Sequence, residues 1–197
     1  MGEKLDVKKW KPFVVPAAIL VVASIMRLIL LNLKPPHFDE GINGWFVDQL
    51  IANGFYRYDP TNYHGPLHFY VLFIFKILFG RSVWALRLSA SLFGIGSVAL
   101  VLGLRRYLSP FTVYSAALFM AVSAGMNFYS RYAIHESELL FFSLLALLGF
   151  FRFEAKRDRT SLWQLSLGLT GMALNKETWI IHVGTFAIAY YALRFYE

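Results

Sequence analysis

The chain contains no cysteine, few charged residues and no internal repeat. The absence of cysteine excludes disulfide bonds and thiolate metal sites, although it identifies no compartment. Charged residues make up only 16% of the 197 residues, whereas a water-soluble domain carries about a quarter. Hydrophobic residues make up 57%, and they form long runs without alternation. Both features predict an integral membrane protein.

The basic residues indicate topology more than a polyanionic partner. The formal charge of +7 would fit a nucleic-acid-binding protein, but Lys and Arg cluster at the ends of apolar runs. We therefore expect no nucleic-acid partner. The basic N-terminus leads into an apolar run at 13–33 that is too long for a secretory signal and lacks a small-residue cleavage pattern. Residues 1–12 are predicted to be a cytoplasmic tail, and 13–33 an uncleaved first span.

Six apolar segments are candidate membrane spans, five of them within 88–197. Several are shorter than the roughly 20 residues that a span needs, so their ends are expected to extend into flanking residues. We predict an all-α integral membrane fold, a single module over 1–197 with about six transmembrane helices. The six candidates are Phe13–Leu33, Leu88–Leu104, Phe111–Tyr129, Leu139–Phe153, Ser161–Leu174 and Trp179–Leu193.

The short apolar run Leu67–Phe79 decides the orientation of the later spans. If this run crosses the membrane, two of the basic clusters that follow it move outside, against the positive-inside rule. We therefore expect it to lie in the outer interface, inside a long outer segment at 34–87. All the basic clusters then lie on the cytoplasmic side: Lys8-Lys9, Arg105-Arg106 and Lys156–Arg159.

The first outer segment is expected to contain a second surface helix. Its apolar residues recur at helical spacing, which predicts a short amphipathic helix with aromatic side chains at headgroup depth. The alternative is a small folded cap that stabilises the bundle. The residues that define this face are Ile42, Trp45, Phe46, Gln49 and Leu50.

Acidic residues recur at the predicted outer edges of the spans. Asp39 and Glu40 follow the first span, and Glu136 and Glu138 precede the fourth. Carboxylates are costly near hydrocarbon, so this recurrence indicates a site, provided that both pairs lie on one side of the membrane. A carboxylate held by a surface helix can act as the general base for a hydroxyl acceptor. Alternatively, Asp39 and Glu40 cap the following helix.

The second acidic segment also carries Arg131 and His135. On a helix, Arg131, His135 and Glu138 would share one face. The alternative is an intrahelical ion pair at the membrane edge. A divalent cation is conceivable because carboxylates and histidine can bind one, although this spacing is weak support.

Two further segments place polar groups on the predicted outer face. Lys176 either neutralises a phosphate of an anionic lipid donor or simply extends to the interface and pairs with Glu177. His64 belongs to a turn before the surface run, and contact with a phosphate or hydroxyl is a secondary interpretation of it.

Arg27 lies inside the first span and must face protein or water.

Five motifs in order along the chain are similar to those of the GT-C glycosyltransferases, multi-span enzymes that include protein O-mannosyltransferases and lipid A aminoarabinose transferases. Each motif alone is weak, but their order covers most of the chain. The motifs are Phe38-Asp39-Glu40, His64-Gly65-Pro66-Leu67, Arg87–Gly94, Ser130–Ala133 followed by Glu136, and Leu174–Glu177.

This resemblance implies a glycosyltransferase that moves a sugar from a polyprenyl-phosphate donor to a hydroxyl of a protein, lipid or glycan on the outer face, with inversion. It implies that Asp39 is the catalytic base, assisted by Glu136 in the second motif, with Glu40 beside the base. The candidate substrate-binding residues are His64, Arg131, His135, Glu138 and Lys176.

The resemblance has departures as well. Gly65 stands where some members carry a phosphate-contacting Lys, and His135 and Glu138 are additional to the usual pattern. The family has more spans and an outer domain, so the chain is expected to be a truncated module or a minimal partner subunit. The alternative function is a non-catalytic transporter or flippase-associated subunit for lipid-linked sugars. The absence of an Asn-x-Ser/Thr sequon slightly favours a prokaryotic plasma membrane over the ER.

Overall fold

The computed structural model describes residues 7–62 and 64–196, with side-chain environments from residue 13 onward. In these residues the chain is helical with short connections, as the sequence predicted. The only extended pairing described is an isolated antiparallel bridge between His64 and Lys176. The helices are α1 (Val7–Leu28), α2 (Phe38–Asn53), α3 (Leu67–Phe79), α4 (Val83–Gly103), η1 (Leu104–Arg106), α5 (Pro110–Val122), α6 (Ala124–Tyr129), α7 (Glu136–Lys156), α8 (Arg159–Asn175) and α9 (Trp179–Tyr196).

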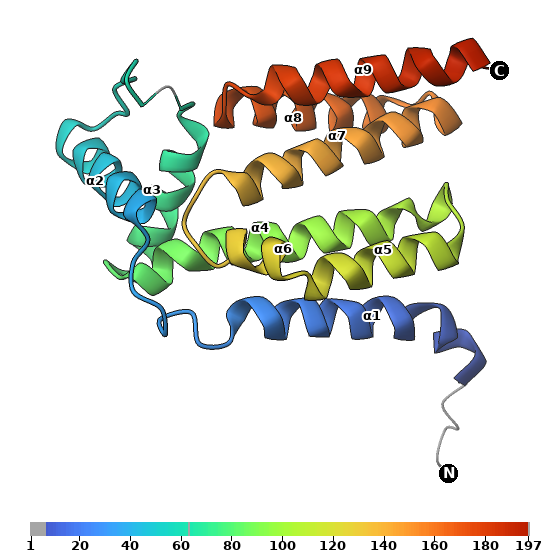
Figure 1. Ribbon diagram of the computed structural model, residues 1–197, viewed down its shortest axis with the longest axis horizontal. Coiled ribbons are helices and arrows are strands. Elements are labelled where there is room, and N and C mark those ends of the chain that lie inside the picture. The colour runs from blue at the N-terminus through green and yellow to red at the C-terminus, as the bar shows by residue number, and fades with distance from the viewer. Residues whose placement is uncertain (1–6, 63, 197) are drawn as a thin grey trace.

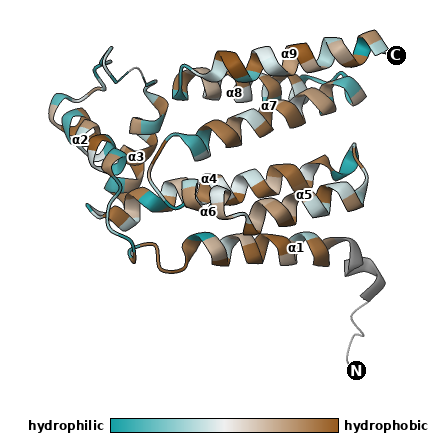
Figure 2. Ribbon diagram, viewed as in Figure 1, coloured by the Kyte–Doolittle hydropathy of each residue, from teal (hydrophilic) through white to brown (hydrophobic). Residues whose placement is uncertain are grey.

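The long helices lie side by side along the long dimension of the molecule, and the two helices of the first outer segment lie across one end. Figure 1 shows α1, α4, α5, α7, α8 and α9 along the long dimension, with α2 and α3 at the left. We call this the α2–α3 end; the connections 29–37, 130–135 and 176–178 also lie there. The opposite end, with 104–109 and 157–158, is the η1 end. Hydrophilic residues concentrate at the two ends and apolar ones along the helices between them (Figure 2).

Helix α3 has the bounds that the sequence predicted for the interfacial run. Its 13 residues extend about 20 Å at 1.5 Å per residue, short of the roughly 30 Å hydrocarbon core. By length and composition, Val83–Arg106 is the one helix in the described residues able to cross a membrane. Phe13–Leu28 and Pro110–Val122 are apolar but shorter. The count of about six spans therefore stays a prediction.

The predicted third span, Phe111–Tyr129, is broken. Helix α5 ends at Val122 and α6 begins at Ala124, because Ser123 takes an extended ψ of 128°. The break leaves carbonyl groups of the last turn of α5 without helical partners. Side chains from elsewhere satisfy them, as described below. The prediction of a single continuous helix over Phe111–Tyr129 is therefore wrong at Ser123.

Helices α7 and α8 pack backbone against backbone. A Cβ on Gly149 would lie 2.5 Å from the Leu165 nitrogen, and one on Gly168 would lie 2.4 Å from the Ala146 nitrogen. Neither position has room for a side chain. Small residues at such contacts are typical of membrane helix pairs, where close approach replaces the hydrophobic effect as the source of association.

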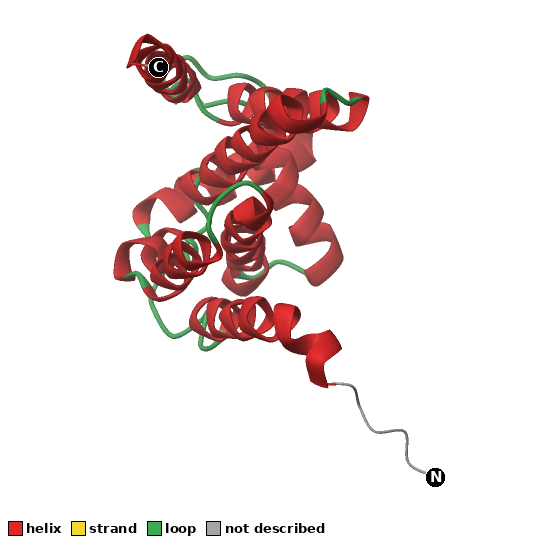
Figure 3. Cartoon of the chain, turned by 90° about the vertical axis from the view of Figure 1, so that its right-hand side faces the viewer, coloured by secondary structure: helices red, strands yellow, loops and turns green. Residues whose placement is uncertain are grey.

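Helix α9 lies at the periphery. Figure 3, seen along the bundle, shows the C-terminal helix at the upper edge. None of its described residues is buried, and large apolar side chains such as Ile181, Ile188 and Leu193 are at least 67% exposed. A helix with this much exposed apolar surface is suited to contact with lipid or with further protein.

The surface helix α2 forms where the sequence predicted it, but its buried face is different. The predicted face included Trp45 and Gln49, which are exposed. The buried residues are Glu40, Asn43, Phe46, Val47 and Leu50. Glu40 and Asn43 belong to the buried face because they find partners inside the protein. The placement of the aromatic side chains at headgroup depth stays a prediction.

Candidate functional site

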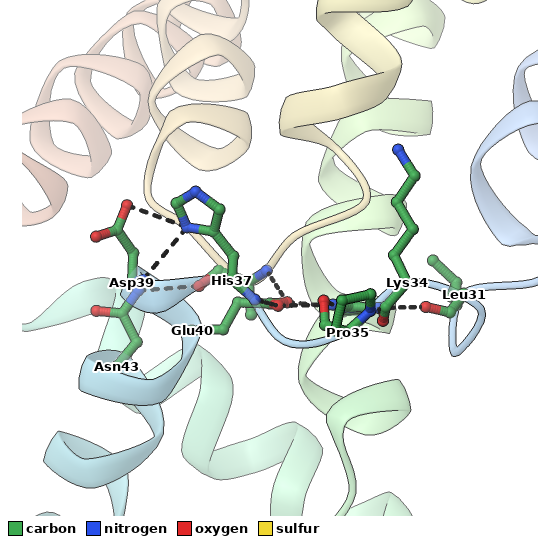
Figure 4. Close-up of polar contacts among 9 residues, drawn as sticks. Leu31, Lys34, Pro35, His37, Asp39, Glu40 and Asn43 are labelled. Carbon is green, nitrogen blue, oxygen red and sulfur yellow. Dashed lines mark hydrogen bonds and ion pairs between the residues drawn. The ribbon is translucent and has the colours of Figure 1, made fainter.

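The N-terminus of α2 is built around His37. The ring Nδ1 of His37 accepts a hydrogen bond from the backbone N–H of Asp39 at 3.3 Å, and the backbone N–H of His37 donates to Glu40 Oε2 at 2.8 Å. This reciprocal pair is a capping box that satisfies two otherwise unpaired donors. The two adjacent acids leave the helix in different directions. Figure 4 shows the Asp39 carboxylate beside the His37 ring, whereas Glu40 extends toward Pro35.

Glu40 is the buried member of the pair, with 4% exposure. Arg87 of α4 donates from Nε to Oε1 at 2.8 Å and from Nη2 to Oε2 at 2.7 Å. Arg87 also donates to the carbonyls of Leu31, Lys34 and Pro35 in the connection from α1. Both carboxylate oxygens of Glu40 are therefore engaged, and the capping alternative describes this residue correctly.

Asp39 is the exposed member of the two adjacent acids. Its side chain is 54% exposed, and its Oδ2 lies 3.4 Å from His37 Nδ1. The carboxylate can therefore meet a ligand from outside the bundle while its backbone is fixed in the first turn of α2. This is the arrangement that a general base requires: an accessible carboxylate on a rigid element.

The structure brings the two acidic segments together. Glu40 Oε1 accepts from the backbone N–H of Ala133 at 3.0 Å, and the Asn43 side chain donates to the Ala133 carbonyl at 2.9 Å. The His37 ring packs against Tyr132, with ring centroids 5.4 Å apart. Both acidic segments thus lie at the α2–α3 end, where they contact each other. Their common side of the membrane stays a prediction.

Arg131 does not share a helical face with His135 and Glu138, because α7 begins only at Glu136. The expectation of one helix over these residues, and of an intrahelical ion pair, is wrong. Arg131 instead donates to the carbonyl of Met26 at 2.7 Å and to that of Leu30 at 3.0 Å. It closes the C-terminal turn of α1, where helix carbonyls lack partners.

Arg27 has a similar role deeper in the bundle. It is fully buried and donates to the carbonyls of Ala121 and Met120, at 3.1 and 3.0 Å. These carbonyls belong to the last turn of α5, which the break at Ser123 leaves open. Arg27 Nε also donates to Ser130 Oγ at 3.2 Å. The sequence indicated that Arg27 must face protein or water, and the structure shows that it faces protein.

Glu136 faces the cationic side chain of Lys176 at the α2–α3 end. Its Oε1 accepts from Lys176 Nζ at 2.7 Å, so Lys176 pairs with Glu136 and not with Glu177. Glu136 also lines a cavity of about 200 Å³ between α1, α4, α6 and α7, which Arg27 and Tyr129 border as well. An acid, a cation and a cavity therefore occur together where α7 begins.

Behind this pair lies a buried polar group that we call the histidine cluster, comprising His64, His68, His135, Glu138 and Asn175. The ring of His135 lies between the other two, with centroid distances of 4.2 Å to His64 and 3.9 Å to His68. His68 Nδ1 is 2.8 Å from Glu138 Oε1, and both side chains are fully buried. Asn175 donates to the His135 carbonyl at 2.9 Å.

Burial dominates the chemistry of the histidine cluster. It lowers the pKa of His135 well below 6.5, with further lowering from His68, His64 and Lys176. Four buried atoms of the cluster lack a hydrogen-bond partner: His68 Nε2, His135 Nε2, Glu138 Oε2 and Asn175 Oδ1. No group of three or more His, Asp or Glu side chains among the described residues could hold a metal ion. The candidate substrate-binding residues His135 and Glu138 are buried, whereas Asp39 is exposed.

The His64 motif and the Lys176 motif are joined by backbone pairing. Gly65 N donates to the Asn175 carbonyl at 3.2 Å, beside the bridge between His64 and Lys176. A Cβ on Gly65 would lie 2.1 Å from the Leu174 carbonyl oxygen, so only glycine fits there. His64 Nδ1 also lies 3.6 Å from Glu177 Oε2. Residues far apart in sequence are therefore held in fixed register.

Sequence reasoning gave His68 no role, although the structure places it at the centre of the histidine cluster. The available signal was a histidine within an apolar run, four residues after His64. Helical spacing does not relate the two residues, because His64 lies before α3 begins at Leu67. The missing information was the partner, Glu138, which is 70 residues away.

Comparisons with known proteins show which family the sequence of this chain matches. Residues 36–191 match the family described as dolichyl-phosphate-mannose-protein mannosyltransferase. Protein O-mannosyl-transferase 1 of Rattus norvegicus is 34% identical over 109 residues, and the protein of the same name from Homo sapiens is 36% identical over 109 residues. Each match covers 53% of this chain and 15% of the relative, so the chain spans a small part of these relatives' length. No solved structure matches.

Proposed function

Because the chain belongs to the dolichyl-phosphate-mannose-protein mannosyltransferase family, we propose that it transfers a sugar from a polyprenyl-phosphate donor to a hydroxyl group. The family description names mannose as the sugar and protein as the acceptor, and we propose the same classes here. The observation that carries this proposal is the difference between the two adjacent acids. Asp39 is exposed, whereas Glu40 is buried and both of its carboxylate oxygens accept hydrogen bonds from Arg87.

In the proposed reaction Asp39 removes the proton of the acceptor hydroxyl. The oxygen attacks the anomeric carbon, the bond from that carbon to the phosphate oxygen breaks, and the polyprenyl phosphate leaves with the electron pair. Attack and departure on opposite faces of the sugar invert that carbon. Glu40 and Arg87 do not touch the substrate. They position Asp39 by fixing the first turn of α2 against α4.

The leaving phosphate needs positive charge. We propose that Lys176 supplies it and that Glu136 holds the ammonium group in place, because the two side chains meet at 2.7 Å and are only partly buried. The cavity beside Glu136 is a candidate for the first isoprene units of the donor. His64 and His135 support the segment that carries Lys176, Glu138 holds His68, and Arg131 supports the end of α1.

The test of this function is transfer of labelled mannose from a polyprenyl phosphate to a Ser/Thr peptide by the membrane-inserted protein. Asp39→Asn keeps the size of the side chain and removes its basicity. We expect transfer to fall by about 10²-fold or more, the usual contribution of a general base. The matched control is Asp59→Asn, an aspartate of the same outer segment whose carboxylate accepts hydrogen bonds from Thr61; it should transfer normally.

If Asp39→Asn transfers mannose at the wild-type rate, Asp39 is not the general base. Donor binding without transfer in the unmodified protein would instead favour the transporter or flippase-associated role. The proposed sidedness has its own test, since the chain has no native cysteine to interfere. In intact cells, an impermeant thiol reagent should label Gln49→Cys on α2 and spare Glu154→Cys near the η1 end. The opposite labelling would place the proposed site on the wrong side.

A further inference from the structure

A second cavity lies at the η1 end, away from Asp39 and Glu136. Its volume is about 460 Å³, and α1, α4, α7 and α8 contribute to its walls. The small residues Ala99 and Gly103 of α4 form its floor, while Leu20 of α1 and Leu148 of α7 line its sides. It exists because small side chains on α4 leave space between the flanking helices. Cavities of this size hold ligands of several hundred daltons.

The polar lining of this cavity is cationic. Arg105 and Arg106 of η1 and Arg152 of α7 line it, and no aspartate or glutamate is among its described lining residues. Arg105 lies over the ring of Phe13, with 5.6 Å between the guanidinium carbon and the ring centroid. Three guanidinium groups around an apolar floor therefore define a space with positive charge at one end and hydrocarbon at the other.

Arg152 carries an unmet hydrogen-bond donor. Its Nη2 donates to Asp158 at 3.3 Å, but its buried Nε has no hydrogen-bond partner. A buried donor without an acceptor is costly, and a guanidinium group presents its donors in a fork that matches phosphate oxygens. A phosphate at this position would supply the missing acceptor and neutralise the cluster.

We propose that this cavity binds an acidic glycerophospholipid, with the phosphate at Arg106 and Arg152 and an acyl chain over Ala99, Leu20 and Leu148. Charge complementarity selects the headgroup and the apolar floor selects a lipid over a free anion. Basic pockets between membrane helices bind acidic lipid headgroups on the cytoplasmic side, which is where the positive-inside pattern places the η1 end. The lipid would lie between α1 and α7, which both line the cavity.

The probe is phosphatidylglycerol, compared with phosphatidylcholine, counted per protein by native mass spectrometry in a neutral detergent. We expect phosphatidylglycerol to be retained in preference. Arg152→Gln should reduce its affinity by about tenfold, which corresponds to about 1.4 kcal/mol, whereas Arg152→Lys should retain part of the preference. The matched control is Arg157→Gln, which removes an exposed cation at the same end that pairs with Glu154 and does not line the cavity.

Equal losses in Arg152→Gln and Arg157→Gln would show general attraction to positive charge and overturn the proposal. Glycerol phosphate should compete poorly, because it lacks acyl chains; competition as strong as that of the lipid would make this a free-phosphate site and would also overturn it. Ala99→Leu fills the floor without touching an arginine. It should lower lipid retention while the helical circular dichroism signal stays unchanged, and full retention in this variant would count against an acyl chain there.

Discussion

Arg87 holds the carboxylate of Glu40 with two hydrogen bonds, Nε to Oε1 at 2.8 Å and Nη2 to Oε2 at 2.7 Å, and neither side chain is more than 3% exposed. The pair joins the first turn of α2 to α4, and Ala133 of the second acidic segment donates to the same carboxylate. A buried ion pair with this many partners is costly to break from one side, because the remaining charge stays in the interior.

Removal of Glu40 should therefore destabilise the protein strongly. We expect Glu40→Ala to lower the free energy of unfolding by about 3–5 kcal/mol, because the Arg87 guanidinium loses its counter-charge. Chemical unfolding in mixed micelles measures this change. The control is Asp39→Ala, which removes the neighbouring, exposed carboxylate and should change stability by less than about 1 kcal/mol.

A double variant separates charge burial from packing. Glu40→Leu with Arg87→Met removes both charges, so it should be more stable than Glu40→Ala alone even though the cap of α2 is lost. If the double variant is instead the less stable, the ion pair contributes more than charge compensation. In either case, mannose transfer should fall in Glu40→Ala, because Asp39 loses its support.

Gly65 should not tolerate a side chain. A Cβ there would lie 2.1 Å from the Leu174 carbonyl oxygen, so Gly65→Ala must separate the His64 segment from the Lys176 segment. We expect a loss of about 1–3 kcal/mol in unfolding free energy and reduced transfer. Gly41→Ala is the control, since a Cβ at Gly41 meets nothing within 4 Å. Equal stability of the two variants would mean that the two segments do not pair this closely.

The histidine cluster should make the fold sensitive to acid. Burial and neighbouring positive charge lower the folded-state pKa of His135 well below 6.5, so the unfolded chain binds the proton more readily than the folded one. Stability is fully present above about pH 6.5 and is lost as the pH falls below that value, by up to about 1.4 kcal/mol per unit for one proton. Unfolding experiments between pH 7.5 and 5 measure the slope.

His135→Phe keeps an aromatic ring in the cluster and removes the titrating group, so it should flatten that slope. His182→Phe is the control, because His182 bonds to Ser143 on α7 and lies outside the histidine cluster. An unchanged slope in His135→Phe would show that His135 is not the source of the acid sensitivity.

Much of the fold follows from local sequence. The apolar runs predicted the helices, and for α3 they predicted both bounds, because Pro66 and Gly80 flank an uninterrupted apolar segment. The break at Ser123 was not predictable in this way. Of the side chains that satisfy the carbonyls at the break, Asn127 is local, but Arg27 lies 94 residues from the Ala121 carbonyl. The partners that bury Glu40 and Asn43 of α2 also lie on other elements, so the sequence alone did not identify them.

For the candidate site, too, the sequence identified some features and missed others. Sequence motifs identified Asp39, Glu40, Glu136 and Lys176 as a group, and the structure gathers all of them at the α2–α3 end. The resemblance singled out Asp39 as the catalytic base, but the sequence did not show that Glu40 is buried against Arg87. It also assigned Arg131 to a helical face, whereas the side chain caps α1. Each error concerns the partner of a charged side chain rather than its position along the chain.

The amino-acid sequence by itself determined that this chain is helical and apolar, and where charged residues interrupt its runs, because helix formation and hydrophobic burial depend on near neighbours and composition. Only the tertiary structure decided which charges are consumed in holding the bundle together and which are left accessible. Arg87 lies 47 residues from Glu40, and the contact between them leaves Asp39 as the accessible acid. Such a choice depends on desolvation and geometry across the fold, which no local pattern records.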